Sequence, residues 1–510
     1  MSAGEGMGMR MRLCRYTSAC AGVPILACVA AMLAFALATA APSFATSGAT
    51  SWGDNEQGQL GNGTTTSSDL PGAVTGLGDG VSAISAGSTH SLALMTSGAV
   101  LAWGANGSGQ LGNGTTTGPE TCPSGFSSVA CATTPGAVGG LSAVRAISAG
   151  GGSSFALLKL GTIMSWGSNF AGALGNGDTT DSAVPVMVSL PSRAKAVSAN
   201  GPHVLALVGT GKVMAWGDNE YGQLGDGTHT GPELCPSAGT STVPCSKTPV
   251  AVGGLRGVIA ISAGDDHNLA LLKDGTVRAW GANNDGQLGN NTTTDSDVPV
   301  AVSGLSGVKA ISAGGFHSMA LLNDGTVMAW GDNGNGQLGD GTIINKHVPV
   351  AVPGLSGIVS ISAGLAHSLA LLGDGTVMAW GWNENGQLGN GTPRGESTLP
   401  LPVVGLSGVT RISAGGYHSL ADSPPPAVTR VTPRKGPTSG GTTVTIIGTD
   451  LNGATSVRFG STSATSYTVN SATSISATSP AGPAGLVDVT VTTPNGTSAI
   501  SPSDRFRFVS

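Results

Sequence analysis

Charged side chains are scarce in this sequence. Asp, Glu, Lys and Arg together make up 10% of 510 residues, and the formal net charge is −6. A protein that holds nucleic acid needs a basic stripe for the phosphates, and the sequence offers none. We therefore expect no nucleic-acid partner.

Catalytic motifs are missing as well. The chain has no Gly-x-Ser-x-Gly elbow, no His-Glu-x-x-His motif and no glycine-rich loop that would cradle a phosphate. Each of these motifs places a nucleophile, a metal or a phosphate where chemistry requires it. Their absence predicts a non-catalytic protein without a cofactor.

The first forty residues differ from the rest. Three arginines precede an apolar run over 23–38 that ends in the small-residue pattern Ala38-Thr39-Ala40. This pattern is typical of an export signal, cleaved after Ala40 or after Ala45. An uncleaved membrane anchor is the alternative, and it would be the chain's link to a membrane. We expect residues 1–40 to be a signal peptide and the protein to be secreted or on the cell surface.

Four cysteines follow this segment, and they stand in two close pairs: Cys122 with Cys131, and Cys235 with Cys245. An even number of cysteines in an exported chain favours disulfides. Both pairs lie in insertions at the same point of a repeated unit, over 117–134 and 229–248. We expect two loops, each held in one shape by a disulfide.

The repeated unit has the frame Trp-Gly-x-Asn-x-x-Gly-Gln-Leu-Gly and returns at a period of about 50 residues. A period of this size indicates a propeller, solenoid or array. Because the tryptophan recurs at one frame position, we expect it to pack between repeats rather than to form a light antenna or stacking surface. The seven frame tryptophans are Trp52, Trp103, Trp166, Trp216, Trp280, Trp330 and Trp380.

Each repeat predicts four short strands. In one copy we expect strands at 308–314, 317–322 and 326–330, with Asp324-Gly325 as a hairpin turn. A fourth strand at 348–352 contains a proline, which suits an outer edge because proline has no N–H to donate. Seven such antiparallel repeats predict an all-β protein with a seven-bladed β-propeller.

The two ends of the repeat region complement one another. Residues 46–52 match a turn and third strand, whereas 412–421 supply first and second strands without a third. We expect both ends to share one blade, with pairing near Leu420 sealing the ring. The propeller would then span 41–421, followed by a proline-rich linker at 422–427. Residues 428–510 alternate at strand period between turns and predict an Ig-like β-sandwich.

The full repeat resembles the RCC1 (regulator of chromosome condensation) family from about residue 44 to 421. The shared motifs are the tryptophan frame, Pro-Val, Ile-Ser-Ala-Gly-x-x-His-Ser-Leu-Ala-Leu and Asp-Gly-Thr-Val. The tail resembles the IPT/TIG immunoglobulin-like domain through Gly436-Pro437, Gly440-Gly441-Thr442, Val457-Arg458-Phe459-Gly460 and Phe506-Arg507-Phe508. Both resemblances imply the folds predicted above.

The first resemblance implies several functions. Its founding member is a guanine-nucleotide exchange factor, and this is the alternative function for the chain. Plant ultraviolet receptors of the family use a Gly-Trp-Arg-His-Thr motif, but residues 87–90 read Gly-Ser-Thr-His here, so that activity is not carried over. Secreted bacterial propellers that inhibit β-lactamases by docking one face are the most similar in setting.

Six histidines hold one frame position, at His90, His203, His267, His317, His367 and His418, and Ser153 takes the seventh. A ring of imidazoles is one metal-binding possibility, but a seven-fold ring spreads its ligands too widely to converge on one ion. We expect instead a partly buried histidine in each blade that bonds the neighbouring backbone, and no metal.

The two residues before each of these positions vary while the frame stays constant. Asp265, Asp266, Phe316 and Tyr417 are the candidate anchors for a partner, since aromatic residues dominate binding hot spots. Trp382 lies outside the frame and is a candidate exposed contact. Ser153 lies in the most irregular copy, between the two stapled loops, and we expect those loops to frame a recognition site over it. The function predicted is recognition of an extracellular protein or glycan, in adhesion or enzyme inhibition.

Overall fold

The computed structural model describes residues 48–77, 80–124, 127–236, 241–392, 395–493 and 495–510. The expected signal peptide at 1–40 lies outside these residues. Among the described residues no helix is long and apolar enough to cross a membrane.

One repeat shows how the sequence builds a blade. Its strands are β21 (Val308–Ala313), β22 (His317–Leu322), β23 (Val327–Gly331) and β24 (Lys346–Ala351), paired antiparallel in chain order. The Asp324-Gly325 turn joins β22 to β23, with Gly325 at φ 90°. The four strands expected for this copy are therefore confirmed.

Seven sheets of this kind, two of them with a fifth strand, lie within the described residues of the repeat region. The strands of the first three complete copies are β3 (Val81–Ala86), β4 (His90–Met95), β5 (Val100–Ala105), β6 (Glu120–Ser124), β7 (Ser127–Ala137), β8 (Val144–Ala149), β9 (Ser153–Leu158), β10 (Ile163–Gly167), β11 (Ser182–Met187), β12 (Ala194–Ala199), β13 (His203–Val208), β14 (Lys212–Asp218), β15 (Glu233–Pro236) and β16 (Thr242–Ala251). The remaining strands are β17 (Val258–Ala263), β18 (His267–Leu272), β19 (Val277–Gly281), β20 (Ser296–Ala301), β25 (Ile358–Ala363), β26 (His367–Leu372), β27 (Val377–Gly381) and β28 (Ser397–Pro402).

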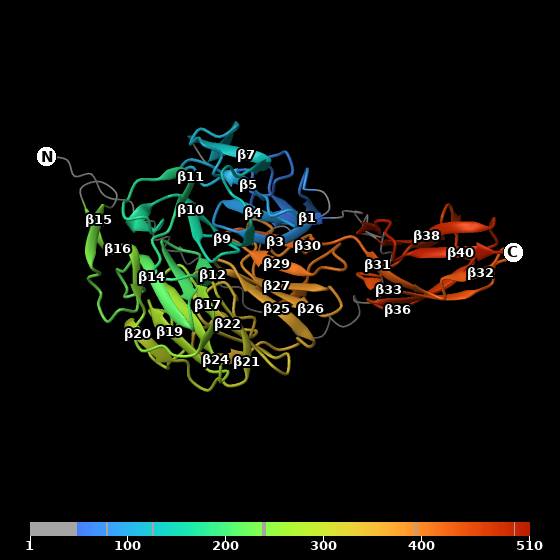
Figure 1. The fold of residues 1–510 in the computed structure, drawn as a ribbon. Coiled ribbons are helices and arrows are strands. Elements are labelled where there is room, and N and C mark those ends of the chain that lie inside the picture. The colour runs from blue at the N-terminus through green and yellow to red at the C-terminus, as the bar shows by residue number, and fades with distance from the viewer. Residues whose placement is uncertain (1–47, 78–79, 125–126, 237–240, 393–394, 494) are drawn as a thin grey trace, which may run out of the picture. The chain divides into compact units, whose positions relative to one another are not determined.

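The first two and the last two strands of the repeat region belong to one sheet. It has the order β2-β1-β30-β29, from β1 (Gly48–Gly53), β2 (Ser68–Ala73), β29 (Arg411–Ala414) and β30 (His418–Ser423). Ser51 pairs with Leu420, and the blue β1 lies beside the orange β30 in Figure 1. The expected sealing of the propeller by its terminal strands is confirmed.

The boundary of the linker was placed too early. Strand β30 continues through Asp422 and Ser423, which pair with Ala49 and Gly48. Asp422 is buried and forms an ion pair with Arg411. A polar residue expected in an exposed linker is thus held in the blade by its counter-ion.

The first strands of neighbouring blades are joined by one recurring hydrogen bond. The serine hydroxyl of the Ile-Ser-Ala-Gly motif accepts a hydrogen bond from the backbone N–H of the motif's alanine in the next blade. Ala363 N–H donates in this way to Ser312 Oγ at 2.9 Å. The same bond runs from Ala86 to Ser413, between the first complete copy and the last strands of the propeller. The motif is therefore a contact between blades.

The tryptophans pack between blades as expected, and all seven are fully buried. The indole N–H of each donates to a backbone carbonyl in the preceding copy, as from Trp380 to Gln337 at 2.9 Å. Gly339 lies against this indole with φ 68°, where a Cβ would stand 2.7 Å from the Trp380 nitrogen. Only glycine fits there, which explains the last residue of the frame.

The tail forms a two-sheet sandwich. Its sheets have the orders β31-β33-β37-β36 and β32-β40-β38-β34-β35, with β39 paired to β38. The strands are β31 (Ala427–Thr432), β32 (Lys435–Pro437), β33 (Thr443–Thr449), β34 (Ser456–Phe459), β35 (Thr462–Ser463), β36 (Ser466–Ser471), β37 (Ser474–Thr478), β38 (Gly485–Thr493), β39 (Gly496–Thr497) and β40 (Arg505–Val509). Phe459, Phe506 and Phe508 pack edge to face in its core.

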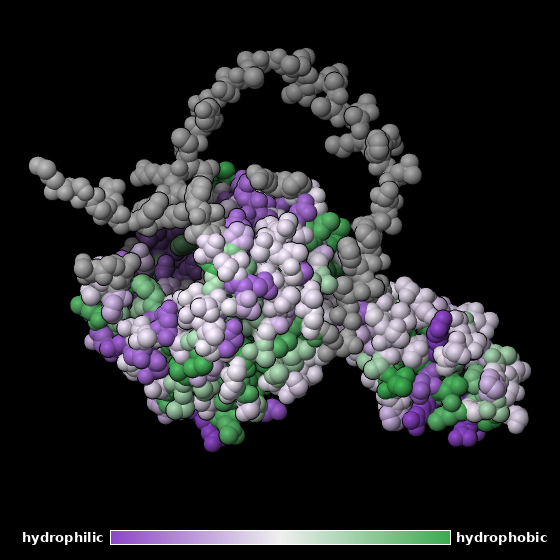
Figure 2. All heavy atoms as spheres, turned by 90° about the horizontal axis from the view of Figure 1, so that it is seen from above, coloured by the Kyte–Doolittle hydropathy of each residue, from purple (hydrophilic) through white to green (hydrophobic). Residues whose placement is uncertain are grey.

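The surface carries little charge. On the face seen in Figure 2, residues of intermediate hydropathy predominate, and hydrophobic and hydrophilic residues are interspersed in small patches. Specific contacts are therefore to be sought where particular side chains converge.

Candidate binding site

The frame histidines form hydrogen-bonded chains between blades. Nε2 of His317 lies 2.9 Å from Ser368 Oγ, and that hydroxyl donates to the Gln337 carbonyl at 2.9 Å. Because the serine has one proton and gives it to a carbonyl, Nε2 must be the protonated nitrogen. His203 makes the equivalent contact to Asn268 Oδ1 at 2.8 Å, and the Asn268 amide donates to the Gln223 carbonyl.

The expectation for these histidines needs two corrections. They are fully buried rather than partly buried, and Nε2 of each contacts a side chain of the next blade. The expected contact with the neighbouring backbone is present at His203, whose Nδ1 lies 3.1 Å from the Asp265 carbonyl oxygen. Burial lowers the pKa of all six, to about 4 for His90, His203 and His367 and to about 3 for His267, His317 and His418. The histidines are therefore neutral and structural at physiological pH.

One junction between blades lacks this chain. Ser153 replaces the histidine, Val204 replaces the serine of the next blade, and Ala173 replaces the glutamine. The Ala173 carbonyl still accepts the Trp216 indole N–H at 2.8 Å, so the tryptophan contact survives. All three replacements shorten a side chain or remove its polar group, and together they leave space at this junction.

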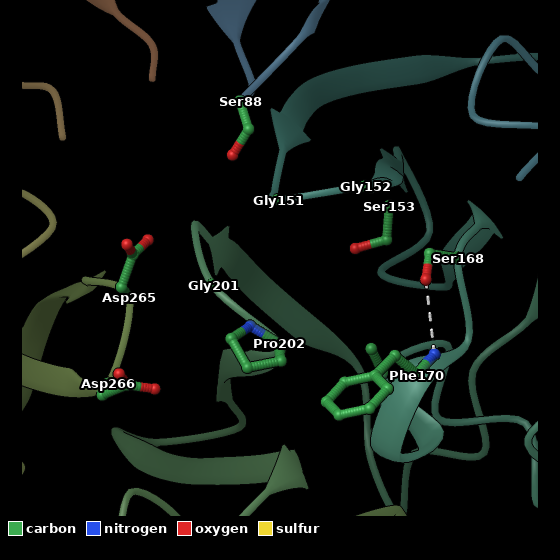
Figure 3. Close-up of a pocket in the computed structure, with 11 residues that line it drawn as sticks. Ser88, Gly151, Gly152, Ser153, Ser168, Phe170, Gly201, Pro202, Asp265 and Asp266 are labelled. Atoms are coloured by element: carbon green, nitrogen blue, oxygen red, sulfur yellow. Dashed lines mark hydrogen bonds between the residues drawn. The ribbon is translucent and has the colours of Figure 1, made fainter. Parts of the chain in front are cut away.

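A cavity of about 420 Å³ lies at this place (Figure 3). We call it the Ser153 pocket. Most of its wall comes from loops between the first and second strands of four consecutive blades. It is lined by Ser88, Gly151, Gly152, Ser153, Ser168, Phe170, Ala173, Gly201, Pro202, Asp265 and Asp266.

Ser153 presents an unused polar group to this pocket. The residue is 2% exposed, and Figure 3 shows its hydroxyl pointing into the space between the loops. Among the described residues its Oγ has no hydrogen-bond partner. The pocket therefore offers a buried hydroxyl that a ligand can engage.

Two carboxylates form another wall, and the lining residues include no Lys, Arg or His. Burial raises the pKa of Asp265 to about 6. Burial and the nearby Asp265 raise the pKa of Asp266 to about 7. Asp218 lies close to Asp266, and burial together with that neighbour raises the pKa of Asp218 to about 7. This side of the pocket thus concentrates negative charge without a counter-ion.

Phe170 belongs to a short helical turn, η1 (Phe170–Gly172), that the regular copies do not have. In those copies the glutamine side chain accepts a backbone N–H two residues earlier, as Gln337 does from Asn335 at 2.9 Å. Ala173 cannot do so, and Ala171 adopts a left-handed conformation with φ 53°. Phe170 is 41% exposed and faces the pocket (Figure 3).

The second stapled hairpin supports this turn. Cys235 and Cys245 form a disulfide, and the buried Ala171 packs against both of these cysteines. Cys122 is bonded to Cys131 in the other insertion, so both expected disulfides are confirmed. No described residue of either hairpin lines the pocket. The hairpin with Cys235 acts on the pocket through η1.

The remaining candidate residues lie apart from the pocket lining. Phe316 is 38% exposed at the tip of its loop. Trp382 is only partly exposed, because its ring packs edge to face on Tyr417 with centroids 5.2 Å apart. Burial raises the pKa of the Tyr417 phenol, with smaller contributions from the charges of Asp265 and Asp54.

Sequence comparison of the repeats thus singled out Ser153, Asp265 and Asp266, which the structure brings together in one pocket. It missed Phe170 and Val204. Val204 was detectable, since the regular copies have Ser or Asn at this position. The placement of Phe170 depends on the shape of η1, which the sequence does not reveal.

Comparison with known proteins agrees with this architecture. The protein-family model for the RCC1-like domain matches residues 48–421, and the family model for the IPT/TIG domain matches residues 426–508. The chain is 34% identical over 244 residues to the human probable E3 ubiquitin-protein ligase HERC6, covering 47% of this chain and 22% of that protein. It is 33% identical over 139 residues to the Arabidopsis thaliana ultraviolet-B receptor UVR8, covering 26% of this chain and 29% of the receptor.

Solved structures show the same fold. Human WBSCR16 superposes with a TM-score of 0.62 at 22% identity, covering 74% of this chain and 99% of that one. Saccharomyces cerevisiae Prp20p, whose binding to Gsp1p and histones is described, superposes with a TM-score of 0.61 at 22% identity, covering 74% of this chain and 91% of that one. The match over 48–421 places the chain in the RCC1-like domain family, with an IPT/TIG domain after the propeller.

Proposed function

We propose that this chain is an exported, non-catalytic binding protein with a seven-bladed propeller, which recognises a partner protein through the loops between its first and second strands. The observation that carries the proposal is the Ser153 pocket, where those loops leave an unfilled space with an unused hydroxyl and two carboxylates. These groups face one space and make no hydrogen bond with a described residue that would occupy them, so they are available to a partner.

Two further observations support the proposal. Both disulfides favour an oxidising compartment, as for exported proteins. Prp20p, a structural neighbour, binds the proteins Gsp1p and histones. At 22% identity this likeness concerns the fold alone, so we extend to this chain the use of a propeller for protein binding and not those partners or nucleotide exchange.

A capture experiment tests the proposal. The purified chain, with its disulfides intact, is used to retain proteins from culture medium and cell envelopes. A second bait carries Asp265→Asn and Asp266→Asn, and a third carries Glu396→Gln, which removes an exposed carboxylate ahead of the outer strand β28. We expect a partner that the first and third baits retain and the second loses. Equal retention by all three baits, or retention of nothing, would contradict the proposal.

A further inference from the structure

We propose that the Ser153 pocket binds a guanidinium group, carried by an arginine side chain of a protein or by a free guanidino compound. This inference rests on the proposed function, because it names the chemical group that the binding site takes. Four features of the pocket support it.

The first feature is the size and shape of the space. At about 420 Å³ it lies within the range of roughly 300–1,000 Å³ that is typical of small-molecule pockets. Gly151, Gly152 and Gly201 contribute no side chain to the wall. At Gly201 a Cβ would overlap the Asp265 carbonyl, so the loops of two blades meet there. Backbone therefore closes the pocket on one side, and the pocket is open toward the solvent.

The second feature is uncompensated negative charge. Asp265 and Asp266 stand next to one another on the loop before β18, and the Asp266 carboxylate points toward Pro202 in Figure 3. Asp218, Glu220 and Asp295 add negative charge around Asp266 from outside the lining. Partly buried carboxylates without a counter-ion cost free energy, and a bound cation removes that cost. The charge pattern excludes anions and favours a cation.

The third feature is an aromatic wall opposite the carboxylates. In Figure 3, Phe170 lies on the far side of the pocket from Asp265 and Asp266, with Pro202 between Asp266 and Phe170. A guanidinium is planar, so its face can stack on the phenyl ring while its edge donates hydrogen bonds. An ammonium group lacks that flat face. The combination of ring and carboxylates therefore favours guanidinium.

The fourth feature is the Ser153 hydroxyl, which is buried and has no partner among the described residues. Its oxygen has lone pairs directed into the pocket and accepts an N–H. A guanidinium has five N–H donors in a fixed fork, so it has donors for the hydroxyl as well as for a carboxylate. Ser153, Asp265 and Asp266 are thus all acceptors that a guanidinium ligand in this pocket can use.

The test uses small probes, so it does not depend on identifying a partner. Binding of agmatine and of the peptide acetyl-Gly-Arg-Gly-amide is measured at pH 8 by calorimetric titration and saturation-transfer NMR. The control peptide replaces arginine by citrulline, which has nearly the same shape without the charge. We expect both guanidinium probes to bind and the citrulline peptide to bind at least about tenfold more weakly, the loss of a charged hydrogen bond.

Variants locate the site. Asp266→Asn and Asp265→Asn should each weaken agmatine about tenfold, and Phe170→Ala a few-fold, whereas Glu396→Gln should leave affinity unchanged. Thermal melting of each variant reports its folding. Agmatine carries a second positive charge in its ammonium group. Peptide affinity that equals or exceeds that of agmatine therefore assigns an arginine side chain as the source, and binding of agmatine without binding of the peptide assigns a free guanidino compound.

Two results would overturn the inference: equal affinity for the citrulline peptide, or unchanged agmatine affinity in folded Asp266→Asn. Failure of the proposed function is distinguishable from failure of the inference. A partner captured by a protein that binds no guanidinium probe leaves the function standing and refutes the inference. If the guanidinium probes bind but no partner is captured, the inference stands and the proposed function is refuted.

Discussion

At the scale of single residues, three replacements at one blade junction act as a unit. Ser153, Val204 and Ala173 stand where the other copies have a histidine, a serine or asparagine, and a glutamine. Each regular junction pairs Nε2 of a buried imidazole with the hydroxyl or amide of the next blade. Replacement of the histidine alone would leave the serine of the next blade without its imidazole contact, and replacement of that serine by valine removes the second polar group too. The pocket is the result of a matched set of changes.

This matching predicts how substitutions combine. Ser153→His alone buries an imidazole against Val204 without a partner, which costs about 1–3 kcal/mol of unfolding free energy. Adding Val204→Ser supplies the hydroxyl, with the Ala173 carbonyl as its acceptor, and should recover most of that loss. Chemical denaturation of both single variants and the double variant measures the coupling. Additive effects would show that positions 153 and 204 are independent.

The repeats themselves made much of this predictable. Each copy serves as a reference for the others, so Ser153 and Ala173 could be recognised as departures without any related protein. Comparison of copies identifies which residue is unusual but not which atoms it then faces. That is why the histidines were assigned a backbone partner, whereas the structure gives Nε2 of each a side-chain partner. The partner stands one residue after the frame histidine of the next blade, and its contact depends on the rotation between blades.

At the scale of elements, each disulfide lies beside the outer strand whose backbone contacts the turn of the preceding copy, a contact that blades without a disulfide also make. The backbone of Lys247, two residues after Cys245, accepts the Gly177 N–H at 3.0 Å and lies against Gly172. Thr133, two residues after Cys131, accepts the Gly63 N–H at 2.9 Å and lies against Gly58. The two disulfides are therefore equivalent in position, and each acts on a different turn.

This equivalence gives a matched pair of variants. Replacing both cysteines of either pair by alanine should cost roughly 3 kcal/mol, because each disulfide closes a loop of about ten residues. Loss of the Cys235 pair should speed amide exchange over 170–177, and loss of the Cys122 pair should speed it over 55–63 instead. Hydrogen exchange followed by mass spectrometry measures both regions. Faster exchange of both turns in both variants would contradict local support.

The strands were more predictable than their ends. Asp-Gly turns and alternating apolar residues located the strands of the blade, since local backbone preference and burial agree there. The end of β30 was misplaced because Asp422 looks like a linker residue until Arg411 is known to lie beside it. Turn η1 had no sequence signal, because it replaces a regular turn whose glutamine contact is lost.

At the scale of the whole molecule, the ring depends on six neutral histidines. Their pKa values in the folded protein lie at about 3 to 4, below the value of 6.5 for an exposed histidine. Between these values the unfolded chain binds more protons than the folded chain, so the free energy of unfolding falls as the pH is lowered. The stabilisation is complete above pH 6.5 and is lost as the pH falls toward 4.

Three carboxyls act in the opposite direction. The pKa values of Asp218, Asp265 and Asp266 are raised, to about 7, 6 and 7, so the folded protein binds protons there that the unfolded chain releases. Their contribution is present at low pH and is lost as the pH rises toward 7. Burial also raises the pKa of two further propeller carboxyls, Asp285 and Asp422. Six histidines outweigh these five carboxyls, so acidification from pH 6.5 to 4 should destabilise the propeller overall.

Tryptophan fluorescence measures this loss in the propeller alone, because all eight tryptophans precede residue 421. We expect the free energy of unfolding, from urea titrations at several pH values, to decrease steadily from pH 6.5 to 4. His317→Gln removes one titrating group and should flatten that slope by about 1.4 kcal/mol per pH unit, at some cost in stability at neutral pH. The same variant with His367→Gln should flatten it about twice as much. If both slopes equal that of the unaltered protein, protonation of the buried imidazoles does not drive acid unfolding, and the ring loses its stability through other groups.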